Sequence, residues 1–136
     1  MADKLRLEIV TPDRLVLAEQ VDEVVLPSLD GYMGVLPGHA PLLAQLDVGE
    51  VSYRTGNQRQ YLAVTGGYAE VLRESVSVLA RTAEPAEEID LERAEQARTR
   101  AQSQLEEGPS PDKLRYAEIH LKRAVSRIQI HGRRQQ

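Results

Sequence analysis

The chain has 136 residues and a formal net charge of −4 at pH 7, a length that fits one domain with an appendage or two small modules. It contains no cysteine, which excludes a disulfide framework and thiolate metal sites, and no tryptophan or phenylalanine, so its core must be largely aliphatic. No apolar run reaches the roughly 18 residues of a membrane span, and the amino-terminal segment lacks the apolar stretch of a secretory signal, so we expect neither a span nor a leader.

Charge is distributed unevenly along the chain. Residues 1–88 carry 7 basic and 14 acidic side chains, whereas residues 89–136 carry 10 basic and 7 acidic ones. The two parts should therefore have different electrostatic partners, although a solvated basic helix face explains the second part equally simply. We expect no nucleic-acid partner, because the basic residues are not interleaved with aromatic ones.

Residues up to about Ala83 predict β-strands. Leu5, Leu7 and Ile9 alternate with Arg6 and Glu8, as in a strand with one buried face. The same alternation recurs at 15–17, 24–26, 51–53, 61–63, 69–71 and 76–80. Turn-forming pairs separate these segments at 11–12, 56–57, 66–67 and 73–74. Many short strands with no helix between them predict an antiparallel β-sandwich, or flattened barrel, of about ten short strands.

The segment 31–43 concentrates glycine and proline within this strand region. Gly31, Gly34 and Gly38 can adopt positive φ, while two prolines each fix φ at about −65°. We therefore predict a rigid surface loop. This loop is either a tight structural turn in which His39 is packed or a surface that contacts another molecule.

The hydrophobic period lengthens after Glu84 and Pro85, from two residues to three or four. Asp90 is the expected amino-terminal cap of a first helix, and Gly108 with its following prolines ends that helix. A second helix is predicted from near Asp112 to Gly132. Two helices joined by so short a connection form an antiparallel hairpin.

We thus predict two domains, a sandwich at 1–86 and a C-terminal α-helical hairpin at 87–136. The helix faces expected to meet are rich in alanine, as at Ala94, Ala97 and Ala101. Alanines allow close approach of helices but bury little apolar area each. The hairpin is therefore either a movable element or a permanently docked one, and the sequence leaves both open.

The sequence offers no enzyme active site. It has no GxxxxGK[ST] phosphate loop and no GxSxG nucleophile elbow. His39, His120 and His131 lie far apart and lack metal-binding spacing, so we expect no metal and no resident cofactor. Function should instead lie in contacts with other molecules.

Four strings in register resemble one protein family. They are the segment 31–43, Thr11-Pro-Asp13, Val64-Thr-Gly-Gly-Tyr68 and Ile89-Asp-Leu-Glu-Arg-Ala94. In these strings the chain resembles the epsilon subunit of the rotary F-type ATP synthase, named delta in mitochondria. The resemblance implies a non-catalytic central-stalk subunit that binds the gamma subunit and the membrane c-ring and helps couple proton flow to ATP synthesis. It also implies a peripheral location at the cytoplasmic face of the bacterial plasma membrane or at the thylakoid membrane.

The resemblance assigns a role to each module. It implies that the loop contacts the rotor through Gly31, Tyr32, Met33, Gly34, His39 and Pro41. It implies that the folded hairpin permits turnover, whereas the hairpin extended along gamma inhibits ATP hydrolysis. The extended form would contact the catalytic alpha and beta subunits through a basic face formed by Lys122, Arg123 and Arg127.

A regulatory ATP is implied by the segment 89–94, which resembles the I/L-D-x-x-R-A motif of ATP-binding epsilon subunits. Asp90 and Arg93 are three residues apart and share a helical face, as do Arg123 and Arg127 at four residues apart. In the folded hairpin these pairs could converge on one ligand, and the resemblance adds Glu84 as a supporting acid. Alternatively, Asp90 only caps a helix and the arginines are surface charge.

A second interpretation of the whole chain is a stand-alone soluble module that senses ATP or binds another small ligand. A self-contained sandwich surface would favour that module. An exposed apolar strip beside residues 31–43 would favour the stalk subunit, because isolated monomers rarely expose large apolar patches.

Overall fold

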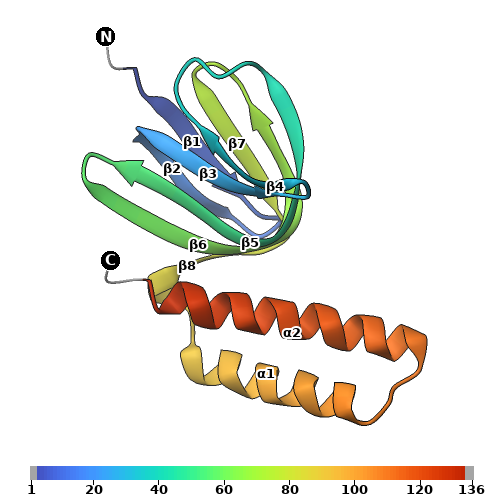
Figure 1. The fold of residues 1–136 in the computed structure, drawn as a ribbon. Coiled ribbons are helices and arrows are strands. Elements are labelled where there is room, and N and C mark those ends of the chain that lie inside the picture. The colour runs from blue at the N-terminus through green and yellow to red at the C-terminus, as the bar shows by residue number, and fades with distance from the viewer. Residues whose placement is uncertain (1–2, 134–136) are drawn as a thin grey trace.

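The computed structural model describes residues 3–133, which form a β-sandwich followed by two helices (Figure 1). The predicted fold class is confirmed. Residues 1–2, in the segment predicted to lack a leader, lie outside the described residues, as do residues 134–136 of the predicted hairpin. No helix within the described range is long and apolar enough to cross a membrane.

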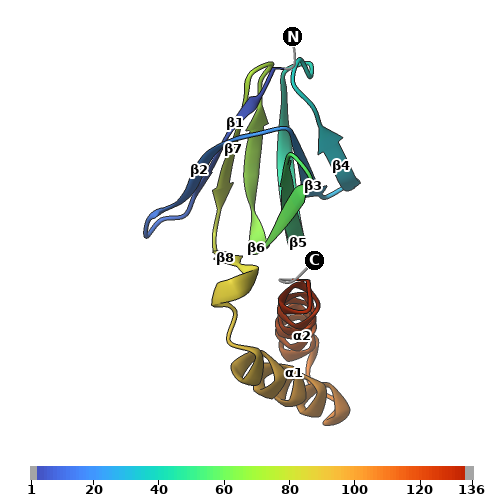
Figure 2. The same ribbon diagram turned by 90° about the vertical axis from the view of Figure 1, so that its left-hand side faces the viewer.

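Eight strands are described, in one sheet that folds over on itself without closing (Figures 1 and 2). They are β1 (Leu5–Val10), β2 (Leu15–Val21), β3 (Glu23–Ser28), β4 (Gly31–Val35), β5 (Leu42–Thr55), β6 (Gln58–Val71), β7 (Ser75–Ala80) and β8 (Ala83–Pro85). The strand order is β2-β1-β7-β6-β5-β3-β4, and β8 also pairs with β6. All pairs are antiparallel except β1 with β7, which are parallel. This parallel pair joins distant segments, so local alternation could not predict it.

The strands β5 and β6 are longer than predicted. Each has 14 residues: β5 begins nine residues before the predicted segment 51–53, and β6 joins the segments 61–63 and 69–71 that the alternation had separated. Gly66 and Gly67, predicted as a turn, have φ of 86° and 121° and let β6 continue through a bend. A Cβ atom on Gly67 would lie 2.0 Å from the carbonyl oxygen of Leu79, so this close approach of β7 requires glycine. The sandwich therefore has fewer strands than the ten or so expected.

The predicted surface loop 31–43 is also shorter than expected. Its first part is β4, which pairs with β3, and only residues 36–41 connect strands. Met33 is half-buried and Val35 fully buried, a period of two that the neighbouring glycines obscured in the sequence. Gly34 accordingly sits in a regular strand without positive φ.

The core between the two halves of the sheet is mainly aliphatic. Its largest fully enclosed side chains are those of Leu5, Leu7, Ile9, Val21, Val24, Leu26, Val35, Val51, Leu62, Val64 and Val71. The cluster that they form lies entirely within residues 5–83. The sandwich thus has a continuous core of its own.

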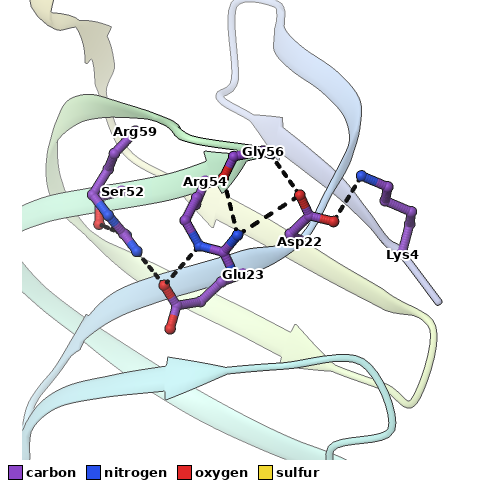
Figure 3. Close-up of polar contacts among 7 residues, drawn as sticks. All are labelled: Lys4, Asp22, Glu23, Ser52, Arg54, Gly56 and Arg59. Carbon is purple, nitrogen blue, oxygen red and sulfur yellow. Dashed lines mark hydrogen bonds and ion pairs between the residues drawn. The ribbon is translucent and has the colours of Figure 1, made fainter. Parts of the chain in front are cut away.

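A charged cluster braces the turn between β5 and β6 (Figure 3). Asp22 accepts a hydrogen bond from the backbone nitrogen of Gly56 and pairs with Lys4, both at 2.7 Å. The adjacent Glu23 pairs with Arg59 on β6. The hydrogen bond from Lys4 is the main reason why the pKa of Asp22 lies below its usual value.

The hairpin follows a short 3-10 turn at Ala86–Glu88 and consists of α1 (Leu91–Glu106) and α2 (Pro111–His131). The predicted ends are confirmed, with Asp90 as the amino-terminal cap of α1 and Gly132 as the carboxy-terminal cap of α2. In both views α2 is the helix nearer the sandwich, and α1 packs on α2 (Figures 1 and 2). The buried side chains of the two helices are mainly small: Ala94, Ala101, Ala117, Ala124 and Ile130.

Candidate functional site

A cleft of about 840 Å³ opens between the hairpin and the sandwich. Its walls come from both helices and from sandwich segments around residues 11–14, 65 and 81–84. Every residue predicted as an ATP ligand lines it, namely Glu84, Asp90, Arg93, Arg123 and Arg127. The fold thus brings together side chains that lie far apart in the sequence.

The wall formed by α1 combines a helix cap with two arginines. The side chain of Asp90 accepts a hydrogen bond from the backbone nitrogen of Arg93 at 3.1 Å, so Asp90 does cap the helix. Arg100, two helical turns beyond Arg93, also lines the cleft. Sequence analysis missed Arg100, although its seven-residue spacing from Arg93 was an available signal. Ala97 and Ala101 lie on the same wall and leave room for a ligand.

The wall formed by α2 carries two arginines, one that forms an ion pair and one that does not. The Nε atom of Arg127 donates to the carboxylate of Glu84 at 2.5 Å. The Nε atom of Arg123 is buried and has no hydrogen-bond partner within residues 3–133. Leaving such a donor unsatisfied is costly, so this position favours an additional acceptor. His120 lies one turn earlier and contacts the ring of Tyr116 at 6.5 Å between centroids.

The sandwich forms the third wall. Arg14 pairs with Glu88 at 3.2 Å, across the junction between the modules. The hydroxyl oxygens of Thr65 and Thr82 lie 2.6 Å apart, and Arg81 stands beside them in the segment between β7 and β8. Sequence analysis missed these residues because they become neighbours of the helices only through the tertiary fold.

The cleft is cationic although the chain as a whole is acidic. Among the described residues, six arginines and four carboxylates line it. Glu84 and Glu88 each pair with one arginine, and Asp90 is used as a cap. Four of the arginines that line the cleft form no ion pair in the described part of the chain, namely Arg81, Arg93, Arg100 and Arg123. This arrangement can hold a multiply charged anion. Within residues 3–133, no three histidine, aspartate or glutamate side chains gather as a metal site.

Ion pairs and one large apolar side chain attach α2 to the sandwich outside the cleft. Lys122 contacts both carboxylate oxygens of Asp47 at 2.9 Å, and Arg133 pairs with Glu50 at 2.8 Å. The hydrogen bond from Lys122 lowers the pKa of Asp47, whereas burial raises the pKa of Glu50 despite the nearby Arg133. Ile130 packs with Ala63, Ala86 and Ile89 in a small apolar cluster. Lys122, predicted as an inhibitory residue, is therefore already paired in this conformation.

The residues predicted for the rotor interface fall on two adjacent segments. Gly31, Tyr32, Met33 and Gly34 belong to β4, while His39 and Pro41 belong to the connection before β5. The ring of Tyr32 is 62% exposed, and its hydroxyl accepts a hydrogen bond from the backbone nitrogen of Glu50 at 3.1 Å. A Cβ atom on Gly49 would lie 2.8 Å from the Cβ atom of Pro27 on β3 as well as from that hydroxyl, so Gly49 is a structural requirement that the sequence did not reveal.

An apolar strip lies on the outer face of the sheet beside this connection. Tyr68 pairs across to Leu79 on β7 and to Gln45 on β5, which puts Leu43 on the same face because side chains alternate along a strand. Leu43, Tyr68 and Leu79 are 69%, 51% and 58% exposed. We call these three residues the outer strip.

Residues 4–86 match the family described as ATP synthase, Delta/Epsilon chain, beta-sandwich domain. Residues 87–132 match its companion, the long alpha-helix domain of the same chain. Among curated proteins, the ATP synthase epsilon chain 2 of Syntrophotalea carbinolica is 50% identical over 98% of this chain and 97% of its own length. The ATP synthase epsilon chain of Syntrophobacter fumaroxidans is 49% identical over 96% and 97%.

Two solved structures are similar as well. A chain of the Euglena gracilis mitochondrial ATP synthase, solved as OSCP/F1/c-ring, has a TM-score of 0.78 at 28% identity and covers 88% of this chain and 76% of its own. A chain from the Tetrahymena thermophila mitochondrial ATP synthase, solved as central stalk and c-ring, has a TM-score of 0.66 and covers 95% and 97%. At 13% identity, this second likeness concerns the fold alone.

Proposed function

The chain belongs to the epsilon subunits of F-type ATP synthase, which are non-catalytic subunits of the central stalk, and from that premise we propose how its two modules act. The family resemblance drawn from four sequence strings is thereby confirmed. In our proposal the sandwich binds the gamma subunit and the c-ring and turns with them, helping to couple proton flow to ATP synthesis. The hairpin regulates ATP hydrolysis. The site of action is the cytoplasmic face of the bacterial plasma membrane or the thylakoid membrane.

The outer strip supports the rotor role of the sandwich. Leu43, Tyr68 and Leu79 form an exposed apolar surface beside His39 and Pro41, and a surface of this kind is typical of a permanent interface. A stand-alone ligand-binding module, the alternative interpretation, gives no reason to expose it.

Co-purification with gamma tests this role. The paired substitution Leu43→Glu and Leu79→Glu should abolish recovery of the chain with gamma while preserving the circular dichroism spectrum. Leu114→Glu, at a leucine 38% exposed on the hairpin, is the matched control and should co-purify normally. Retention of gamma by the strip variant would remove these residues from the interface.

The attachment of α2 supports a regulatory hairpin. Lys122 and Arg127, two of the residues predicted to contact the catalytic subunits, pair here with Asp47 and Glu84 on the sandwich. Because one cation cannot serve both partners, extension of the hairpin would release these side chains for an acidic surface elsewhere. Truncation after Glu107 should therefore raise ATP hydrolysis by the reconstituted catalytic complex. Equal rates with the full-length and truncated chains would argue against inhibition.

The cationic cleft supports binding of ATP by the folded hairpin. Arg93 and Arg123 come from facing helices, have no ion pair in the described structure and line one cavity with the Glu84–Arg127 pair. A ligand held by both helices favours the folded state over the extended one, since it binds only the former. We expect binding without hydrolysis, because the sequence has no GxxxxGK[ST] phosphate loop.

Calorimetry of the full chain with ATP tests the site. The wild type should bind, and Arg93→Gln should weaken binding strongly. Arg115→Gln, an exposed α2 arginine outside the cleft, is the control for loss of one charge. Absence of heat with the wild type at millimolar ATP would leave Asp90 as a cap and the arginines as surface charge.

A further inference from the structure

Arg81 is a cation of the cleft that the proposed function does not use. It lies on the sandwich, in the two-residue connection between β7 and β8, and its exposed side chain has no ion pair or hydrogen bond within residues 3–133. The other sandwich arginine of the cleft, Arg14, is already paired with Glu88. In the described part of the sandwich wall, Arg81 is therefore the arginine that remains available to a ligand in the cleft.

The backbone around Arg81 is held on both sides. Its nitrogen donates to the carbonyl oxygen of Gly66 at 3.3 Å, and the nitrogen of Thr65 donates to the carbonyl oxygen of Thr82 at 3.3 Å. The hydroxyl groups of Thr65 and Thr82 meet at 2.6 Å. β7 and β8 both pair with β6, so the segment that carries Arg81 is fixed at its two ends. A guanidinium carried by such a fixed backbone segment is well suited to orient a ligand.

We propose that Arg81 binds the phosphates of the nucleotide from the sandwich side, so that the ligand bridges the two modules. This inference rests on the proposed nucleotide site and assigns it a ligand outside the hairpin. Arg93, Arg100 and Arg123 line the same cavity from the helices. A triphosphate is long and highly charged, so it can contact guanidinium groups on opposite walls at once.

A bridging ligand has a consequence that a ligand held by the hairpin alone does not have. The complete set of cations exists only when the hairpin is docked on the sandwich, so binding and docking are thermodynamically linked. Nucleotide should then hold the hairpin against the sandwich as well as hold the two helices together. Arg81 would transmit this effect although it lies outside the moving element.

Calorimetry with ATP on the full chain tests the role of Arg81. Arg81→Gln should weaken binding about tenfold, the scale of one charge-assisted hydrogen bond at a partly exposed site. Arg81→Lys should recover part of the loss, because it keeps the charge without the planar fork. Arg73→Gln removes an exposed sandwich arginine outside the cleft and should bind ATP as the wild type does.

Thermal unfolding without ATP and hydrogen exchange with ATP give two further measurements. Without ATP, Arg81→Gln should melt as the wild type does, because the side chain has no partner to lose. With saturating ATP, hydrogen exchange in α2 should slow in the wild type and slow clearly less in Arg81→Gln. An equal ATP effect in both proteins would mean that nucleotide acts within the hairpin alone and would overturn the bridge.

The outcomes separate this inference from the function on which it rests. If Arg93→Gln loses binding while Arg81→Gln and Arg73→Gln both match the wild type, the nucleotide site stands and the bridge is wrong. If the wild type itself binds no ATP, both the nucleotide site and the bridging role of Arg81 are wrong. A loss in Arg81→Gln that Arg73→Gln reproduces would assign the effect to net charge and would also overturn the bridge.

Discussion

The sandwich and the helical hairpin bury very different side chains. The sandwich encloses a continuous cluster of leucine, isoleucine and valine within residues 5–83, whereas the buried positions of the two helices are alanines and Ile130. Within residues 3–133, α2 and the adjacent Arg133 are attached to the sandwich by three acid–base pairs and by the small cluster around Ile130. One chain thus combines an element with its own core and an element held largely by surface contacts.

This difference has energetic consequences. Complete burial of a leucine or valine stabilises a fold by about 1.5–3 kcal/mol, whereas an exposed ion pair contributes about 0–1 kcal/mol and weakens with salt. The sandwich should therefore be stable without the hairpin, and docking of the hairpin should depend on conditions. A rotor subunit that is also a regulator needs both properties.

The largest effect is expected in the sandwich core. Leu26 is fully buried, and Leu26→Ala should lower the free energy of unfolding by about 2–5 kcal/mol through lost burial and the cavity left behind. Leu114→Ala, at a partly exposed leucine of α2, should cost clearly less. Urea denaturation followed by circular dichroism measures both, and equal losses would contradict the contrast between the modules.

The second effect should separate docking from folding. Ile130 packs on Ala63, Ala86 and Ile89, and Ile130→Ala should weaken docking by about 2–4 kcal/mol while the sandwich keeps its stability. Hydrogen exchange should accelerate in α2 and remain unchanged in β5 and β6. A uniform loss of protection along the chain would show that the two modules unfold as one.

The third effect concerns the ion pair between Lys122 and Asp47. A double-mutant cycle with Lys122→Gln and Asp47→Asn should give a coupling energy of about 1 kcal/mol or less, because both groups are partly solvated. The coupling should shrink further at high salt. A coupling several times larger and insensitive to salt would mean that this pair is the main attachment.

The fourth effect is a dependence on pH that differs between two acids. The pKa of Asp47 is lowered by its hydrogen bond with Lys122, so its contribution to docking is present above the value of the undocked chain, about 4, and is lost as pH falls through the lowered pKa. The pKa of Glu50 is raised by burial, so ionisation of this carboxyl opposes docking as pH rises through the raised pKa.

These opposite shifts distinguish the two pairs by substitution. At pH 7, Asp47→Asn should weaken docking, whereas Glu50→Gln should strengthen it slightly, because it removes a carboxylate whose ionisation opposes docking, although the partner Arg133 is only 2.8 Å away. Hydrogen exchange of α2 in the two variants is the comparison to make. If protection of α2 fell more with Glu50→Gln than with Asp47→Asn, these opposite roles of the two acids in docking would be wrong.

The helices were predictable because their ends are encoded locally. Asp90 caps α1, Gly108 follows its end with a φ of 64°, and Gly132 caps α2, each within a residue or two of the bounds expected from the sequence. The long strands were not predictable in the same way, because Gly66 and Gly67 signal a turn locally but here form a bend that tertiary contacts stabilise. The parallel pairing of β1 and β7 has no local signal at all.

The cleft residues likewise divide into those that local sequence spacing can predict and those that only the tertiary fold brings into the cleft. Helical spacing predicted that Arg123 and Arg127 share a face, and the family resemblance implied that Arg93 would join them at one site. The same spacing applied two turns beyond Arg93 would also have found Arg100. Nothing in the sequence near Arg81 marks it as a cleft residue. Its proximity to the helices depends on where β8 leaves the sheet, which is a property of the whole fold.

Hydrogen exchange of the full chain at low and high salt tests the contrast between the modules most directly. We expect the amides of β5 and β6 to keep their protection when the salt concentration rises about tenfold, while those of α1 and α2 lose protection as the ion pairs at Asp47 and Glu84 are screened. Helices and strands that lose protection together, with the same free energy of opening, would contradict an independently stable sandwich that carries a conditionally docked hairpin.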